Sequence, residues 1–202
     1  MARYTGPKNK LARRVGIDLG LKTTPTKLQR RLGIPPGQHG RKGRGKVSDY
    51  GIQLTEKQKL KWTFGVQERQ LRRYYEQATK TKQATGTALL QLLERRLDNV
   101  IYRLGFAPTR AFARQLVSHG HALVGGKKVS IPAYQTQVDE TITLNTKALK
   151  IPEVKGLLEQ KNPQIPQWLT RLAAVGKISR LPEREDVALD INEQLIVEFY
   201  SR

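Results

Sequence analysis

Positive charge is concentrated in the first 46 residues, and this limits how that end of the chain can fold. The segment holds 13 Lys or Arg and a single acid, Asp18, so it carries +12 of the formal net charge of +20. Gly and Pro recur through it, as in Gly6-Pro7 and Pro35-Pro36-Gly37, and they interrupt any sustained helical or strand period. We therefore expect residues 1–46 to form an irregular or extended arm.

The total charge and the composition exclude several classes of protein. A pI near 10.5 indicates a polyanionic partner. No apolar run approaches the roughly 18 residues that span a membrane, and the polar start lacks the apolar stretch of a signal peptide. The chain has no Cys, which excludes disulfides, a thiolate nucleophile and a cysteine-ligated zinc site. We expect a soluble protein that is not exported and acts in the cytoplasm, with an organelle as the open alternative.

The other end of the chain has the opposite charge. Residues 183–202 hold six acids and two Arg, which gives this segment a net charge of −4. Phosphates repel such a segment, so we expect it to pack on the basic helices of the same chain or on a neighbouring protein.

Three helices are expected after the arm. Ser48 offers an N-cap before a helix over 53–64 that Gly65 ends, and a second helix covers 67–80. A third runs from Ala88 to about Leu104, because apolar residues recur there at steps of three and four. Its apolar stripe is Leu89, Leu92, Leu93, Leu97, Val100, Ile101 and Leu104. We expect Arg95, Arg96, Asn99 and Arg103 to project away from that stripe.

Shorter elements follow this helix. A short helix over 108–120 precedes two extended runs, 121–124 and 127–131, and Gly125-Gly126 between them is a hairpin signal. A strand is expected at 141–144, a short helix at 152–161 and a terminal helix from Asn192.

These elements predict an α+β fold. The parts are an extended basic arm at 1–46, a helical domain at 47–91 on which 183–202 packs, a small α/β module at 92–156 with two helices and a short antiparallel sheet, and a linker at 157–182.

One segment resembles a known family of RNA-binding modules. LLERRLDNVIYRLGFAPTRAFARQLVSHGHALVGGKKVSIPAYQ, residues 92–135, is similar to the module named after ribosomal protein S-four. Four further segments resemble the ribosomal family itself, so the likeness covers essentially the whole chain. They are ARYTGPKNKLARR at 2–14, PPGQHGRKGRG at 35–45, SDYGIQLTEKQKLK at 48–61 and DINEQLIVEFYSR at 190–202.

The resemblance implies a function and a set of partners. Members of the family bind small-subunit ribosomal RNA and help to nucleate assembly of its 5′ domain. They contact the small-subunit protein called S-five at an interface linked to decoding accuracy, and they help to line the mRNA entry channel. Some members bind zinc through cysteines in the arm, a role that this cysteine-free chain cannot have.

Candidate RNA contacts follow from charge and residue type. Lys and Arg neutralise phosphates, Tyr4 and His39 can stack on bases, and Gly37 and Gly40 permit close backbone approach to RNA. In the arm the candidates are Arg3, Tyr4, Lys8, Lys10, Arg13, Arg14, Gln38, His39, Arg41, Lys42, Arg44 and Lys46. In the helices and the module they are Arg69, Arg72, Arg73, Arg96, Arg103, Arg110, Arg114, Lys127 and Lys128.

Each candidate has a plainer interpretation. Helical Arg residues are often solvated charges, and Trp62, Tyr74, Tyr75 and Tyr102 lie on helical stripes that are more typical of a core or an interface than of a platform for bases. His119 and His121 are close in sequence, but without Cys or a carboxylate partner they indicate packing rather than a metal site. No cofactor is predicted.

Two other classes of protein carry the same module. One is an RNA-modifying enzyme or its subunit, and the other is a free-standing RNA quality-control binder. The chain shows no paired carboxylates, nucleophile triad or metal cluster, and little of it remains for a catalytic domain, so we expect no enzymatic activity. A quality-control binder would not account for the long arm.

Overall fold

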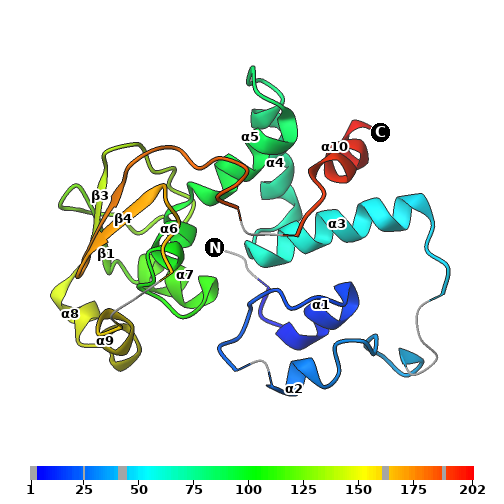
Figure 1. The fold of residues 1–202 in the computed structure, drawn as a ribbon, viewed down its shortest axis with the longest axis horizontal. Coiled ribbons are helices and arrows are strands. Elements are labelled where there is room, and N and C mark those ends of the chain that lie inside the picture. Colours follow the sequence, from blue (N-terminus) through cyan, green and yellow to red (C-terminus); the bar gives the residue numbers. More distant parts are fainter. Residues whose placement is uncertain (1–3, 25, 41–44, 161–163, 188–189) are drawn as a thin grey trace. The chain divides into compact units, whose positions relative to one another are not determined.

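The computed structural model describes residues 4–24, 26–40, 45–160, 164–187 and 190–202 (Figure 1). The chain divides into two compact units. One comprises residues 1–88 with 189–202, and the other comprises residues 89–188. The predicted mixed class is confirmed, since helices and a small antiparallel sheet are both present. Among the described residues, no helix is both long enough and apolar enough to cross a membrane.

The arm contains more regular structure than its Gly and Pro content predicts. Helix α1 spans Lys8–Val15 and α2 spans Thr26–Gln29. Leu11, Val15, Leu19 and Leu28 are each at most 6% exposed. These apolar side chains are sparse in the sequence, but helix α1 brings several of them onto one face, so this part of the arm has a small core of its own.

Helices α3, α4 and α10 also belong to the first unit. Helix α3 spans Asp49–Thr63, α4 spans Glu68–Ala78 and α10 spans Glu193–Ser201. The predicted caps are confirmed, because Ser48 accepts a hydrogen bond from Gly51 N and Asn192 accepts from the first turn of α10. The cap at Ser48 starts α3 four residues before the expected position at 53.

The acidic end packs on its own chain, as one of the two expectations proposed. Helix α10 contacts α3, and the Gln53 amide donates to the Glu198 carboxylate over 2.9 Å. Lys59 lies between the two segments, with its Nζ 2.7 Å from Glu56 Oε1 and 3.0 Å from the Asp190 carbonyl. The acidic end therefore contacts α3 through the Glu198 carboxylate and the backbone carbonyl of Asp190.

A polar cluster joins α3, α4 and α10 around Glu68. Its carboxylate accepts hydrogen bonds from Lys57 at 2.7 Å, Lys61 at 3.0 Å and the Tyr200 hydroxyl at 2.9 Å. The Lys57 ammonium also lies 4.3 Å from the centre of the Phe199 ring. Burial acts to raise the pKa of Glu68, but these three donors outweigh it and hold the pKa below its usual value.

This lowered pKa predicts how stability depends on pH. The Glu68 contacts are fully present above the pKa of an unfolded Glu and are lost as the pH falls through the lower folded value. A Glu68→Gln variant should therefore be less stable than the parent at neutral pH, with a gap that narrows below about pH 4. Thermal unfolding followed by circular dichroism across this range measures the gap. A gap that is constant with pH would contradict the assignment.

The second unit combines helices with a five-stranded antiparallel sheet. Helix α5 spans Thr85–Glu94, α6 spans Leu97–Arg103 and α7 spans Arg110–Ser118. The strands are β1 Ala122–Val124, β2 Lys127–Lys128, β3 Thr141–Leu144, β4 Leu169–Leu172 and β5 Val175–Ile178, in the antiparallel order β2-β1-β3-β5-β4. Helices α8 Thr146–Leu149 and α9 Pro152–Leu158 lie between β3 and β4 in the sequence. Leu97, Ile101, Phe106, Ile142 and Trp168 belong to the core of this unit.

The β1–β2 hairpin is as predicted from Gly125-Gly126. Both glycines have positive φ, +55° and +79°, which a two-residue turn of this kind requires. Val124 pairs with Lys127 and Leu123 with Lys128 across the turn. This register leaves both lysines exposed at the edge of the sheet.

The long helix expected from Ala88 to Leu104 is interrupted at Arg95 and Arg96. Arg96 forms an isolated antiparallel bridge with Gln135, and Thr136 N donates to the Arg95 carbonyl over 3.0 Å. Leu97 N donates to the Tyr134 carbonyl over 2.9 Å. Pairing with residues about 40 positions away in the sequence thus replaces the helical hydrogen bonds at this point.

The segment 157–182, which we expected to be a linker, contributes β4 and β5. Strand β5 pairs with β3, so this segment extends the sheet of the module. The turn between the two strands contains Ala173 at φ +50° and no Gly or Pro, so the usual turn signal is missing from the sequence. Arg171 fixes the turn by donating to the Ala173, Leu104 and Leu157 carbonyls.

Candidate nucleic-acid interface

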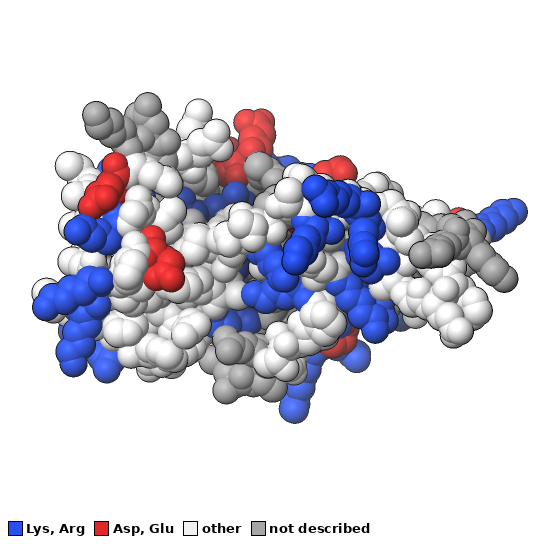
Figure 2. Space-filling view, turned by 90° about the horizontal axis from the view of Figure 1, so that it is seen from below, with Lys and Arg blue, Asp and Glu red and all other residues white. Residues whose placement is uncertain are grey.

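Lys and Arg side chains gather over the part of the chain that carries α1 and α2 (Figure 2). Of the predicted contacts in the arm, Lys10, Arg14 and Lys46 are exposed. Tyr4, Gln38 and His39 are also exposed, whereas Lys8 is half-buried. The other expected contacts of the arm, Arg3, Arg41, Lys42 and Arg44, lie outside the described residues.

Arg13 has a structural role in the arm. Its Nε lies 2.8 Å from the Ile34 carbonyl and its Nη2 lies 3.0 Å from the Pro35 carbonyl. The guanidinium therefore ties α1 to the segment that follows α2. These bonds occupy two of the five N–H donors of Arg13, and its predicted contact with RNA stays a prediction.

The arm glycines also serve the local fold. Gly40 N donates to the Gly37 carbonyl over 3.2 Å, and Gly37 has φ +114°. A Cβ at Gly40 would overlap the Pro35 carbonyl oxygen, so no other residue fits there without a shift of the backbone. We expected these glycines to admit RNA; the close approach at Gly40 is to the chain itself.

Helix α4 presents its basic face to solvent. Arg69, Arg72 and Arg73 are exposed, while Leu71, Tyr74 and Ala78 are buried. Arg72 forms a long ion pair of 3.4 Å with Glu76, and both side chains are more than half exposed. Such a pair is weak and leaves the guanidinium accessible to another anion.

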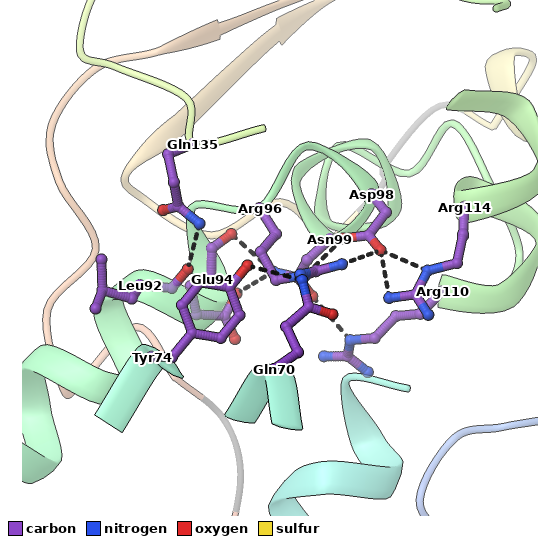
Figure 3. A network of polar contacts seen from close by, with 10 residues as sticks. All are labelled: Gln70, Tyr74, Leu92, Glu94, Arg96, Asp98, Asn99, Arg110, Arg114 and Gln135. Atoms are coloured by element: carbon purple, nitrogen blue, oxygen red, sulfur yellow. Dashed lines mark hydrogen bonds and ion pairs between the residues drawn. The ribbon is translucent and has the colours of Figure 1, made fainter. Parts of the chain in front are cut away.

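The predicted cations of α6 and α7 belong to a polar network (Figure 3). The Asp98 carboxylate accepts two hydrogen bonds from Arg96, at 3.1 and 2.8 Å, and bonds of 2.8 and 2.7 Å from Arg114. The Arg96 side chain is 0% exposed, so the expectation that it projects outward and extends a basic surface is wrong. The break in the helix turns Arg96 inward, and Asp98 compensates its charge.

A second carboxylate anchors the other half of this network. Glu94 is fully buried and accepts bonds from Arg103 at 3.0 and 2.6 Å and from the Asn99 amide at 2.6 Å. Burial acts to lower the pKa of Arg103, but the nearby Glu94 charge raises it above its usual value. Sequence reasoning missed Glu94; an acid inside an otherwise apolar helical run is the signal that could have found it.

Arg110 joins the same network through Asn99. Its Nε donates to Asn99 Oδ1 over 2.8 Å, and the guanidinium lies 4.5 Å from the centre of the Tyr102 ring. Burial lowers the pKa of Arg110 below its usual value. Because the Arg103 and Arg114 side chains are only 14% and 13% exposed, the arginines of α6 and α7 first of all hold the module together.

Lys127 and Lys128 differ from these arginines. Both are exposed on the β1–β2 hairpin, which makes them the accessible members of the predicted set in this unit. Near the hairpin, His121 Nδ1 lies 3.1 Å from Asn145 Oδ1, whereas His119 is exposed. Within the described residues, no group of three or more His, Asp or Glu is arranged to hold a metal ion.

The chain is similar to known proteins over its whole length. Residues 3–94 match the model of the ribosomal protein S4/S9 N-terminal domain, and residues 95–142 match that of the S4 domain. The chain is 50% identical to small ribosomal subunit protein uS4 of Brevibacillus brevis and 51% identical to that of Akkermansia muciniphila, with 100% of both chains covered in each case. The chain belongs to the uS4 family.

The family assignment confirms the resemblance seen in the sequence. The uS4 protein of Aquifex aeolicus is likewise 50% identical over its full length. The boundary between the two matched family models, at residues 94 and 95, coincides with the end of α5 and the break before α6. The S4 domain therefore begins where helix α5 ends and residues 95–97 pair with residues 134–136.

Proposed function

We propose that this uS4-family chain is a structural, non-catalytic component of the small ribosomal subunit that binds its ribosomal RNA. The observation that carries the proposal is the +12 charge of residues 1–46, together with the exposure of Lys10, Arg14 and Lys46. The folded part of the arm exposes these cations to solvent, which suits binding to phosphates. Such binding does not require sequence-specific contacts with the bases of the RNA.

The accessible cations define the proposed RNA-facing residues. The accessible cations of the arm, of α4 and of the β1–β2 hairpin contact phosphates. The arginines of the buried network stabilise the module to which the hairpin belongs. The proposed contacts are Tyr4, Lys8, Lys10, Arg14, Gln38, His39, Lys46, Arg69, Arg72, Arg73, Lys127 and Lys128. Affinity for RNA then falls steeply with salt, because each phosphate contact releases counterions.

The finer roles follow from the resemblance to the family. The chain nucleates assembly of the 5′ domain of the small-subunit RNA and contacts the neighbouring protein S-five at an interface linked to decoding accuracy. It also contributes to the mRNA entry channel.

The hairpin lysines provide a test of this RNA face. Replacing Lys127 and Lys128 by Gln should weaken binding to 5′-domain RNA about tenfold and reduce the salt slope by about two, since each lysine contributes about one phosphate contact. The melting temperature should stay the same, because both side chains are exposed. Filter binding over a series of salt concentrations measures both quantities. An unchanged slope would move the RNA face of the module elsewhere.

A further inference from the structure

The first unit contains a cavity between helices α1 and α3. Its volume is about 350 Å³, and it is lined by Arg14, Val15, Leu54, Thr55, Gln58 and Trp62. The four α3 residues are spaced along one face of that helix, at 54, 55, 58 and 62. The size lies in the range of cavities that hold small organic groups.

Gln58, which lines the cavity, has an unsatisfied polar atom. Its Oε1 is buried and has no hydrogen-bond partner among the residues that the structure describes. A buried acceptor of this kind costs free energy unless a donor reaches it. The neighbouring Thr55 hydroxyl cannot serve, because it donates to the Gly51 carbonyl over 2.7 Å. This acceptor is therefore unsatisfied within the part of the chain that the structure describes, and an N–H group of an occupant can supply the donor.

The other walls select a flat group with a negative charge attached. Trp62 is half-buried, packs against the cluster of Ala12, Leu19 and Leu28, and also lines the cavity. Its indole ring offers a surface for stacking. Arg14 is exposed and supplies a positive charge beside the cavity. The basic arm around it repels Lys and Arg side chains of other proteins and attracts a phosphate backbone.

We propose that this cavity binds one unstacked nucleotide of RNA. The base stacks on Trp62, an N–H on the base edge donates to Gln58 Oε1, and Arg14 contacts the adjoining phosphate. Proteins commonly read RNA through bases that leave the helix and stack on aromatic side chains. This inference rests on the proposed RNA-binding function and adds a base-recognition site to an interface otherwise made of phosphate contacts.

Tryptophan fluorescence tests the proposal directly. The chain has two tryptophans, and the second, Trp168, is fully buried in the other unit. Titration of the full chain with transcribed 5′-domain RNA should quench the Trp62 emission, and a Trp62→Phe variant that still binds RNA should show no such quenching. RNA that binds with full affinity and leaves the Trp62 emission unchanged would overturn the inference while the proposed function stands.

Affinity measurements on Gln58 separate recognition from folding. Gln58→Leu removes a buried acceptor that has no partner, so the fold should be retained. Binding should weaken about tenfold with an unchanged salt slope, whereas Gln160→Leu, at an exposed position in the other unit, should bind like the parent. Equal affinity of Gln58→Leu and the parent would contradict the proposal. A change in emission that appears only in assembled subunits would assign the cavity to a protein partner, and the absence of any RNA binding would overturn the proposed function as well.

Discussion

Replacing Asp98 by Ala should lower the free energy of unfolding by about 3–5 kcal/mol. Asp98 is the carboxylate between Arg96 and Arg114, and its own side chain is 5% exposed. Its loss leaves the positive charge of the buried Arg96 without the carboxylate that compensates it. Removing one partner of a buried ion pair is costly because the other charge stays away from water. Urea denaturation of the variant and the parent, followed by the fluorescence of the buried Trp168, measures the difference.

Asp139 offers a matched control for this prediction. It pairs with Lys177 at 2.9 Å in the same unit, but the two side chains are 76% and 51% exposed. Asp139→Asn should change the free energy of unfolding by less than about 1 kcal/mol, because exposed pairs contribute little and Asn also tolerates the positive φ at this position. An Asp98→Ala variant as stable as Asp139→Asn would show that the network does not support the module.

Neutralising three cations of the arm should weaken RNA binding strongly. Lys10, Arg14 and Lys46 are exposed in the described part of the arm, so their replacement by Gln leaves the small core of α1 and α2 intact. If each contacts one phosphate, affinity for 5′-domain RNA falls about 30-fold or more at moderate salt, and the salt slope decreases by about three. Filter binding over a salt series gives both numbers.

A control with the same loss of charge is available outside the proposed interface. Lys147, Lys150 and Lys155 lie on or next to α8 and α9 and are also exposed. Their replacement by Gln should leave the salt slope nearly unchanged. Equal losses in the two triple variants would mean that the total charge of the chain, and not the surface of the arm, determines binding.

The sequence predicts those elements whose signals are local. The Leu spacing of α5 and α6, the Ser48 and Asn192 caps and the Gly125-Gly126 turn all act within a few residues, and each appears in the structure. The family resemblance was equally accessible, because its motifs lie in several separate segments of the chain.

The elements that sequence reasoning missed depend on contacts between distant residues. Arg95 and Arg96 both have a high helix propensity. The helix is nevertheless interrupted there, because the backbone pairs with residues 134–136. Strands β4 and β5 are joined by a turn without Gly or Pro, and Arg171 stabilises it through carbonyls far away in the sequence. Burial of Arg96 and Glu94 had the same origin, since charged side chains become core residues only when partners meet them in the fold.

The structure separates the predicted RNA contacts into accessible side chains and side chains with partners inside the chain. The exposed cations of the arm, of α4 and of the hairpin lie where charge alone suggested. Arg13, Arg96 and Arg103 instead use their donors within the chain, which a count of charges does not distinguish from binding to a ligand. Arg13 connects α1 to the segment after α2, whereas Arg96 and Arg103 form ion pairs inside the module that carries Lys127 and Lys128.

Sedimentation of small ribosomal subunits after a high-salt wash tests the central claim most directly. A structural component that is bound to folded RNA through many phosphate contacts should stay with the washed subunits in a ratio of about one chain per particle. An RNA-modifying enzyme or a quality-control binder would leave the particles during the wash. Quantitative release of the chain into the supernatant would contradict the proposal that it is a structural part of the small subunit.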